Sequence, residues 1–127
     1  MPALFRRIFS TKFLPLSWTI LTIALLCLPG SMVPGNGIFA MKNLDKIVHV
    51  ILFGFNVLFW GWHFAVAEKT GKRLRSLFLA AVVLVILLGV VMEYVQLYFI
   101  PNRSFDTWDI VADAVGALLA GIWLLRS

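Results

Sequence analysis

Charged residues are scarce in this sequence, and their scarcity excludes an ordinary soluble protein. Only 13% of the residues are charged, 61% are hydrophobic, and the mean hydropathy is +0.96. Soluble domains average about 25% charged and roughly 45–50% apolar residues. The apolar runs are continuous rather than alternating with a period of two, so they favour membrane helices over a membrane barrel. We therefore expect an all-α integral membrane protein.

Cysteine and the familiar catalytic signatures are also nearly absent. Cys27 is the single cysteine and lies in an apolar run, which excludes an internal disulfide and a thiolate metal cluster. No glycine-rich phosphate loop, nucleophile elbow, dinucleotide fingerprint or H-E-x-x-H motif occurs. The net charge is +5, but the basic residues do not gather on one amphipathic surface, so nucleic acid is not an expected partner.

Four apolar stretches are each close to the roughly 20 residues that a helix needs to cross a bilayer. They predict helices at about 13–30, 44–67, 76–100 and 107–125. Pro29-Gly30 and Pro101-Asn102 end the first and third of these helices, because proline cannot continue a helix. Residues 1–127 are thus expected to form one domain, a four-helix membrane bundle, with a short basic turn at 69–75.

The basic residues are distributed unequally between the two sides of this bundle. One side carries eight of them: Arg6, Arg7, Lys12, Lys69, Lys72, Arg73, Arg75 and Arg126. The other side carries Lys42, Lys46 and Arg103. Because cytoplasmic loops carry the excess of Lys and Arg, both termini are predicted to be cytoplasmic, in a bacterial plasma membrane. Five of the six acids then lie on the outer half.

Polar residues within the apolar runs fall at one depth. With a rise of about 1.5 Å per residue, His49, Glu93 and Asp113 each lie about 18–27 Å from the cytoplasmic ends of their helices. In a hydrocarbon core about 30 Å thick, this places them between the outer third and the outer interface. Asp45 and His49 are four residues apart and share a helix face. We expect three polar faces to meet in a pocket that opens outward.

An ionised side chain inside a bilayer costs about 2.5–3.5 kcal/mol, so these acids must be paired, protonated, hydrated or bound to a ligand. Lys46 and Arg103 are the available cations, and an Arg fork suits a carboxylate or a phosphate. His49, Glu93 and Asp109 are the catalytic candidates. The predicted ligand-binding residues are Asp45, Lys46, His49, Glu93, Gln96, Arg103, Asp106, Asp109 and Asp113.

These residues resemble the VanZ-like family of small bacterial membrane proteins. The similarity lies in Asp45-Lys46-x-x-His49-x-x-x-Phe53, in Glu93-x-x-Gln96, and in Arg103-x-x-Asp106-x-x-Asp109 with Asp113 and Gly116, over roughly 44–121. Members of the family often have Asn where this chain has Asp113. The family's namesake is associated with resistance to teicoplanin, a glycopeptide that acts on lipid-linked peptidoglycan precursors. The resemblance therefore implies a setting in the cell envelope.

Four interpretations of the polar residues stay open at this stage. They bind the head group of an envelope lipid, such as a polyprenyl-linked precursor, whose tail lies between helices. They hold a divalent cation or supply a general acid and base to an intramembrane hydrolase or transferase. They relay protons in a carrier, which would require a homo-oligomer. Alternatively, they only fix the register of the bundle, in which Arg103 and Lys46 pair with acids. Membrane lipids are the expected partners.

Overall fold

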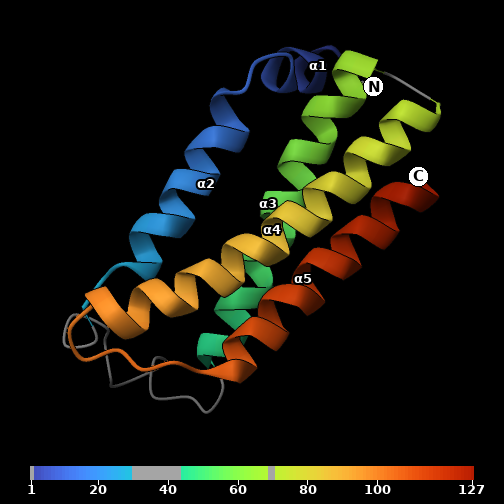
Figure 1. Cartoon of the computed structure of the whole chain (residues 1–127). Helices are drawn as coiled ribbons and strands as arrows, with labels where there is room; N and C mark the ends of the chain where they lie inside the picture. Colours follow the sequence, from blue (N-terminus) through green and yellow to red (C-terminus); the bar gives the residue numbers. More distant parts are fainter. Residues whose placement is uncertain (1, 30–43, 69–70) are drawn as a thin grey trace.

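The computed structural model describes residues 2–29, 44–68 and 71–127, and every regular element in these ranges is a helix. The elements are α1 (Ala3–Phe9), α2 (Phe13–Leu26), α3 (Leu44–Glu68), α4 (Lys72–Phe99) and α5 (Thr107–Arg126). Figure 1 shows α2 to α5 as long helices in one bundle, with α1 lying across one end. The all-α prediction is confirmed.

Three of the helices, α3, α4 and α5, are each long and apolar enough to cross a membrane. The pair α1 and α2 passes the same test only when taken together, and the two helices meet at an angle of 57°. Within the described residues the protein therefore has three candidate spans, or four if the bent pair is one span. The polytopic helical architecture predicted from hydropathy agrees with this.

The helix ends differ from the predicted ranges where basic residues follow glycine. The range 76–100 corresponds to α4, which begins four residues earlier, at Lys72. Gly71, with φ of 99°, precedes it and adopts a backbone conformation that other residues rarely take. Lys72, Arg73 and Arg75 therefore lie in the first turns of α4 rather than in the predicted basic turn. Similarly, α2 ends at Leu26, and the separate helix α1 was not expected.

Helices α3 and α5 pack against each other at small residues. A Cβ atom at Gly116 of α5 would overlap the carbonyl oxygen of Val50 on α3, and one at Gly54 would lie 3.3 Å from the carbonyl oxygen of Gly116. Phe53, Val57 and Ala117 are completely buried beside this contact. Small residues thus let α5 approach α3 closely, and this contact fixes α5 against α3.

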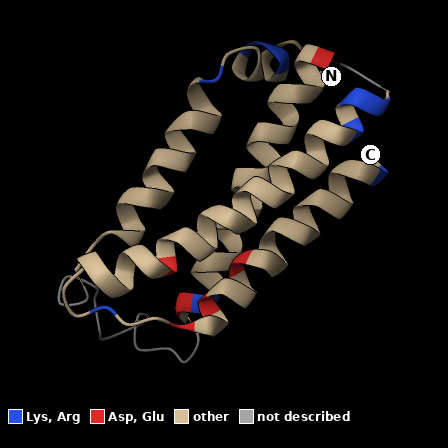
Figure 2. Ribbon diagram, in the orientation of Figure 1, with Lys and Arg blue, Asp and Glu red and all other residues tan. Residues whose placement is uncertain are grey.

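The two ends of the bundle differ in charge. Figure 2 shows the Lys and Arg residues mainly at the end that carries both chain termini, and most Asp and Glu residues at the opposite end. Both termini therefore lie at one end of the bundle, as expected from the alternating direction of the helices. The assignment of that end to the cytoplasm, and of the chain to a single domain, stays a prediction.

Candidate functional site

Lys46, in the first turn of α3, joins three aspartates at the acidic end of the bundle. Its Nζ donates to Asp45 Oδ2 at 2.7 Å, to Asp106 Oδ2 at 2.6 Å and to Asp109 Oδ1 at 2.7 Å. Its side chain is 23% exposed, and Asp109, at 11%, is the most buried of the three acids. Because an ammonium has three donors, Lys46 satisfies all of them here and ties α3 to the start of α5.

Asp106 connects this lysine to α4. It is the N-cap of α5, where its Oδ1 accepts from the backbone N–H of Trp108 at 2.9 Å. Its own backbone N–H donates to Glu93 Oε2 at 3.0 Å. The hydrogen bond from Lys46 holds the pKa of the Asp106 carboxyl below its usual range. Asp106 is therefore an ionised junction between α3, α4 and α5.

A more deeply buried pair lies one turn further into the bundle. His49 Nδ1 of α3 is 2.6 Å from Asp113 Oδ1 of α5, and both side chains are almost completely buried. The other ring nitrogen, Nε2, is 3.7 Å from Asp109 Oδ2, which is longer than a hydrogen bond. The imidazole stacks on the ring of Phe53, with 6.1 Å between the ring centres. This arrangement fixes the direction in which Nε2 points.

The second oxygen of Asp113 is the unusual atom of the site. Asp113 Oδ2 is buried and has no hydrogen-bond partner among the described residues. This oxygen faces Gly89 of α4, where an added Cβ atom would lie 2.5 Å from it. Gly89 therefore leaves the space into which the carboxylate projects. A buried oxygen without a partner costs about 1–3 kcal/mol, more when it is charged, and calls for a cation or a donor.

Negative charge exceeds positive charge in the cluster. Its carboxylates are Asp45, Glu93, Asp106, Asp109 and Asp113, whereas Lys46 is the one Lys or Arg bonded to them in the described part of the chain. His49 adds a positive charge only when it is protonated. The depth estimate correctly brought together His49, Glu93 and Asp113, and the resulting cluster attracts cations and hydrogen-bond donors rather than bare anions.

Gln96 and Arg103 do not join this cluster. Gln96 Nε2 donates to the carbonyl oxygen of Leu26 at 2.9 Å, and Arg103 Nε donates to that of Leu28 at 3.0 Å. Gln96 therefore binds a carbonyl group that α2 leaves unpaired at its last residue, whereas Arg103 binds one that lies two residues after α2 ends. The pairing of Arg103 with an acid, which belonged to the interpretation that the cluster only fixes the register of the bundle, is not found among the residues that the structure describes.

A second polar group, between α2 and α3, was missed at the level of sequence. Asn56 is completely buried, donates to Thr22 Oγ1 at 2.9 Å and accepts from Thr19 Oγ1 at 2.7 Å. Trp60 Nε1 donates to Thr19 Oγ1 at 2.9 Å. The signal was an asparagine within an apolar run, but hydroxyl groups on the uncharged helix α2 gave no comparable sign. These bonds attach α2 to the bundle.

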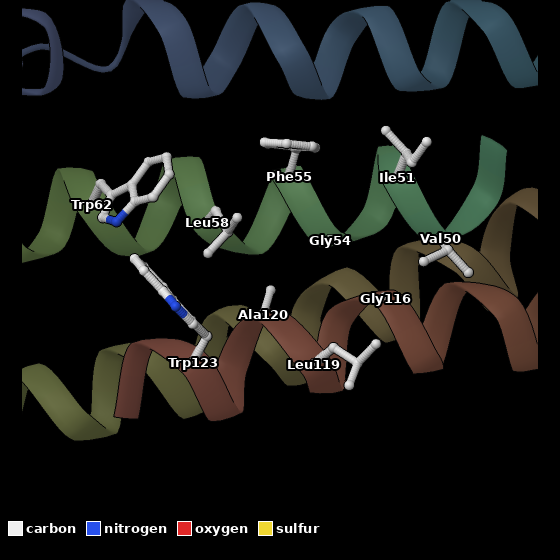
Figure 3. Close-up of a pocket in the computed structure, with 10 residues that line it drawn as sticks. All are labelled: Val50, Ile51, Gly54, Phe55, Leu58, Trp62, Gly116, Leu119, Ala120 and Trp123. Atoms are coloured by element: carbon white, nitrogen blue, oxygen red, sulfur yellow. The ribbon is translucent and has the colours of Figure 1, made fainter. Parts of the chain in front are cut away.

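An apolar groove lies between α3 and α5 (Figure 3). Its volume is about 430 Å³, and it is lined by Val50, Ile51, Gly54, Phe55, Leu58, Trp62, Gly116, Leu119, Ala120 and Trp123. Val50 follows His49 directly, and Gly116 is three residues from Asp113. At the far end, the rings of Trp62 and Trp123 meet edge to face, with 6.0 Å between the ring centres. The groove thus extends from the cluster toward the end with both termini.

Comparison with known proteins gives one family. The family described as VanZ/LLP1 matches residues 3–126, which is nearly the whole chain and includes all five helices. No curated protein and no solved structure gives a significant match.

Proposed function

The chain belongs to the VanZ/LLP1 family, and from this premise we propose that it binds an envelope lipid at the acidic end of the bundle. The hydrocarbon tail lies in the groove between α3 and α5, and the head group lies against the cluster of Lys46 and its neighbouring acids. The observation that supports the proposal is that an apolar groove and a charged cluster occur on the same two helices, with Val50 and Gly116 of the groove one and three residues along the chain from His49 and Asp113 of the cluster. An amphiphile has these two parts in the same order.

The tail of such a lipid fits the groove chemically. The lining residues are aliphatic, aromatic or glycine, and several lie on the surface that faces a bilayer, with Leu119 60% exposed and Ile51 46% exposed. A prenyl or acyl chain can enter sideways from the bilayer without crossing a polar layer. The two glycines, Gly54 and Gly116, lower the floor of the groove because they have no side chains.

The cluster selects the head group by charge. A bare phosphate meets one ammonium, that of Lys46, among several carboxylates, so repulsion opposes it. Hydroxyl, amide and ammonium groups instead donate to carboxylate oxygens. In a polyprenyl-linked precursor, the sugar hydroxyl and amide groups satisfy this requirement, whereas its diphosphate meets the same repulsion as a phospholipid phosphate except at Lys46.

The family resemblance adds a biological consequence to the proposal. Teicoplanin acts on lipid-linked peptidoglycan precursors, so a protein that retains such a precursor in a bacterial plasma membrane changes the amount accessible to the antibiotic. We therefore expect expression of the chain to alter teicoplanin susceptibility through the same groove. Antibiotic susceptibility is then a cellular readout of groove occupancy.

Filling the groove tests the proposal. Leu119→Trp places a large side chain in the lining, and we expect it to reduce binding of a polyprenyl-diphosphate-linked amino sugar at least tenfold, because the tail loses its contact area. Binding is measured with purified protein in nanodiscs, with phosphatidylglycerol as the competing anionic lipid.

Leu118→Trp is the matched control, because Leu118 is the preceding residue, is 50% exposed and does not line the groove. We expect it to bind the amino-sugar lipid as the wild type does. Equal binding by both variants, or equal affinity of the wild type for phosphatidylglycerol, contradicts the proposal. Teicoplanin susceptibility of cells that express each variant should follow the binding result.

A further inference from the structure

Three buried residues from three helices converge at the inner side of the cluster. His49 of α3, Glu93 of α4 and Asp109 of α5 are all buried, and one potential ligand atom from each lies within 4.8 Å of the other two. We propose that these residues bind one divalent first-row transition-metal ion, such as Zn²⁺ or Mn²⁺. The proposal concerns the metal alone and does not depend on the lipid.

The hydrogen bonds around the three residues leave atoms free to coordinate. Asp109 uses Oδ1 for Lys46, and its Oδ2 faces His49. Glu93 uses Oε2 for the backbone N–H of Asp106. The separation of 3.7 Å between His49 Nε2 and Asp109 Oδ2 is too long for a hydrogen bond. It suits two ligands of one ion, which lie about 3–4 Å apart when each is about 2.0–2.2 Å from the metal.

Asp113 supplies an independent observation. Its Oδ1 is bonded to His49 Nδ1, so a proton on Nδ1 leaves the lone pair of Nε2 directed at Asp109. Metal-binding histidines usually donate their second ring nitrogen to a carboxylate in this manner, which fixes the tautomer. Asp113 as a whole is only 1% exposed, and its remaining oxygen, Oδ2, has no hydrogen-bond partner among the described residues. Positive charge in the site compensates this uncovered carboxylate.

The neighbouring acidic group is a contrast to the proposed site. Asp45, Asp106 and Asp109 also lie close enough together to hold an ion. Lys46 Nζ, however, already lies within 2.7 Å of an oxygen of each, so an ammonium takes the place of a metal there. No comparable Lys or Arg contact with Glu93 or Asp113 occurs in the described ranges.

The ligand set indicates the type of metal. One imidazole with two carboxylates is a nitrogen and oxygen set that suits zinc, manganese or iron, whereas calcium and magnesium prefer oxygen ligands alone. With three protein ligands, one or more positions remain for water or another ligand. The site therefore binds Zn²⁺ and Mn²⁺ more tightly than Mg²⁺ or Ca²⁺.

Metal titration of the purified full chain, first stripped with a chelator and without added lipid, tests this proposal. We expect Zn²⁺ and Mn²⁺ to bind at least tenfold more tightly than Mg²⁺ or Ca²⁺. Glu93→Gln should weaken Zn²⁺ binding at least tenfold, because an amide is a poorer ligand than a carboxylate of the same shape. Mn²⁺ bound to the wild type should show nitrogen hyperfine coupling from the His49 ring.

Asp45→Asn is the matched control, because it removes one negative charge from the same cluster at an exposed position outside the proposed ligands. It should bind Zn²⁺ within about twofold of the wild type. If Asp45→Asn and Glu93→Gln lose the same amount of Zn²⁺ affinity, the loss reflects the net charge of the cluster, and the proposal is overturned. Equal affinity of the wild type for Zn²⁺, Mn²⁺, Mg²⁺ and Ca²⁺ also overturns it. If Glu93→Gln does not fold, the hyperfine spectrum of the wild type decides, since absence of nitrogen coupling excludes His49 as a ligand.

Discussion

Gly116→Ala is expected to destabilise the bundle by about 2 kcal/mol, an unusually large effect for one added methyl group. The new Cβ would overlap the carbonyl oxygen of Val50, and a backbone atom in the middle of α3 cannot move aside alone. Helices α3 and α5 must therefore separate, although alanine is the better helix former by about 1 kcal/mol. The change is measured by reversible denaturation of both proteins in the same mixed micelles.

Gly121→Ala provides the control on the same helix. There the added Cβ would meet a methyl group of the Val82 side chain, which can adjust more easily than the backbone. The helix preference of alanine then offsets most of the crowding, and we expect a change of less than about 1 kcal/mol. If the two variants are equally stable, the contact between Gly116 and Val50 does not determine how α5 packs on α3.

Lys46→Met is expected to cost about 2 kcal/mol of unfolding free energy, because it removes the ammonium shared by three carboxylates. Breaking a fully buried pair costs about 3–5 kcal/mol, and the partial exposure of Lys46 and of two of its partners reduces this. Asp109 should account for the largest share of this lost free energy, because its side chain is only 11% exposed. Methionine keeps much of the length of the side chain, so packing changes little.

A double-mutant cycle separates this electrostatic effect from packing. Adding Asp109→Asn to Lys46→Met should recover about half of the lost stability, because the most buried uncompensated charge is removed. Lys72→Met, which removes an exposed lysine at the opposite end of the bundle, should leave stability nearly unchanged. A similar loss in Lys72→Met, or no recovery in the double mutant, would show that net charge rather than the Lys46 contacts is responsible.

These stability measurements also address the structural interpretation of the cluster. A cluster that only fixes the register of the helices loses stability when Lys46 is changed, but it binds neither metal nor lipid selectively. A functional site gives the separate losses expected for Glu93→Gln and Leu119→Trp. The cluster can therefore contribute to stability and also bind a ligand, and the ligand-binding measurements distinguish a functional site from a purely structural one.

Much of the site was predictable because helix geometry fixes depth. Continuous apolar runs require helices in a bilayer, and a fixed rise per residue places His49, Glu93 and Asp113 at one level. The structure confirms that these residues come together. Their proposed roles in binding stay predictions. The family could also be identified from the spacing of these residues, and the match over 3–126 confirms it.

Other features depended on helix rotation and crossing, which rise alone does not specify. Arg103 has the same charge as Lys46 and was predicted on the same side of the bundle, yet it binds the carbonyl oxygen of Leu28, two residues after α2 ends. The hydrogen bonds of Asn56 with two threonines depend on how α2 faces α3. Neither partner is encoded by spacing within a single helix.

The sequence by itself determined the medium, the helical class and the depth of the acids, because these follow from hydropathy and from a constant helical rise. Tertiary structure alone decided that Lys46 neutralises three aspartates, that Asp113 orients His49, and that an apolar groove begins beside them. The physical reason is that pairing and groove shape depend on the separation and rotation of helices, which the close contact of Gly116 with Val50 sets.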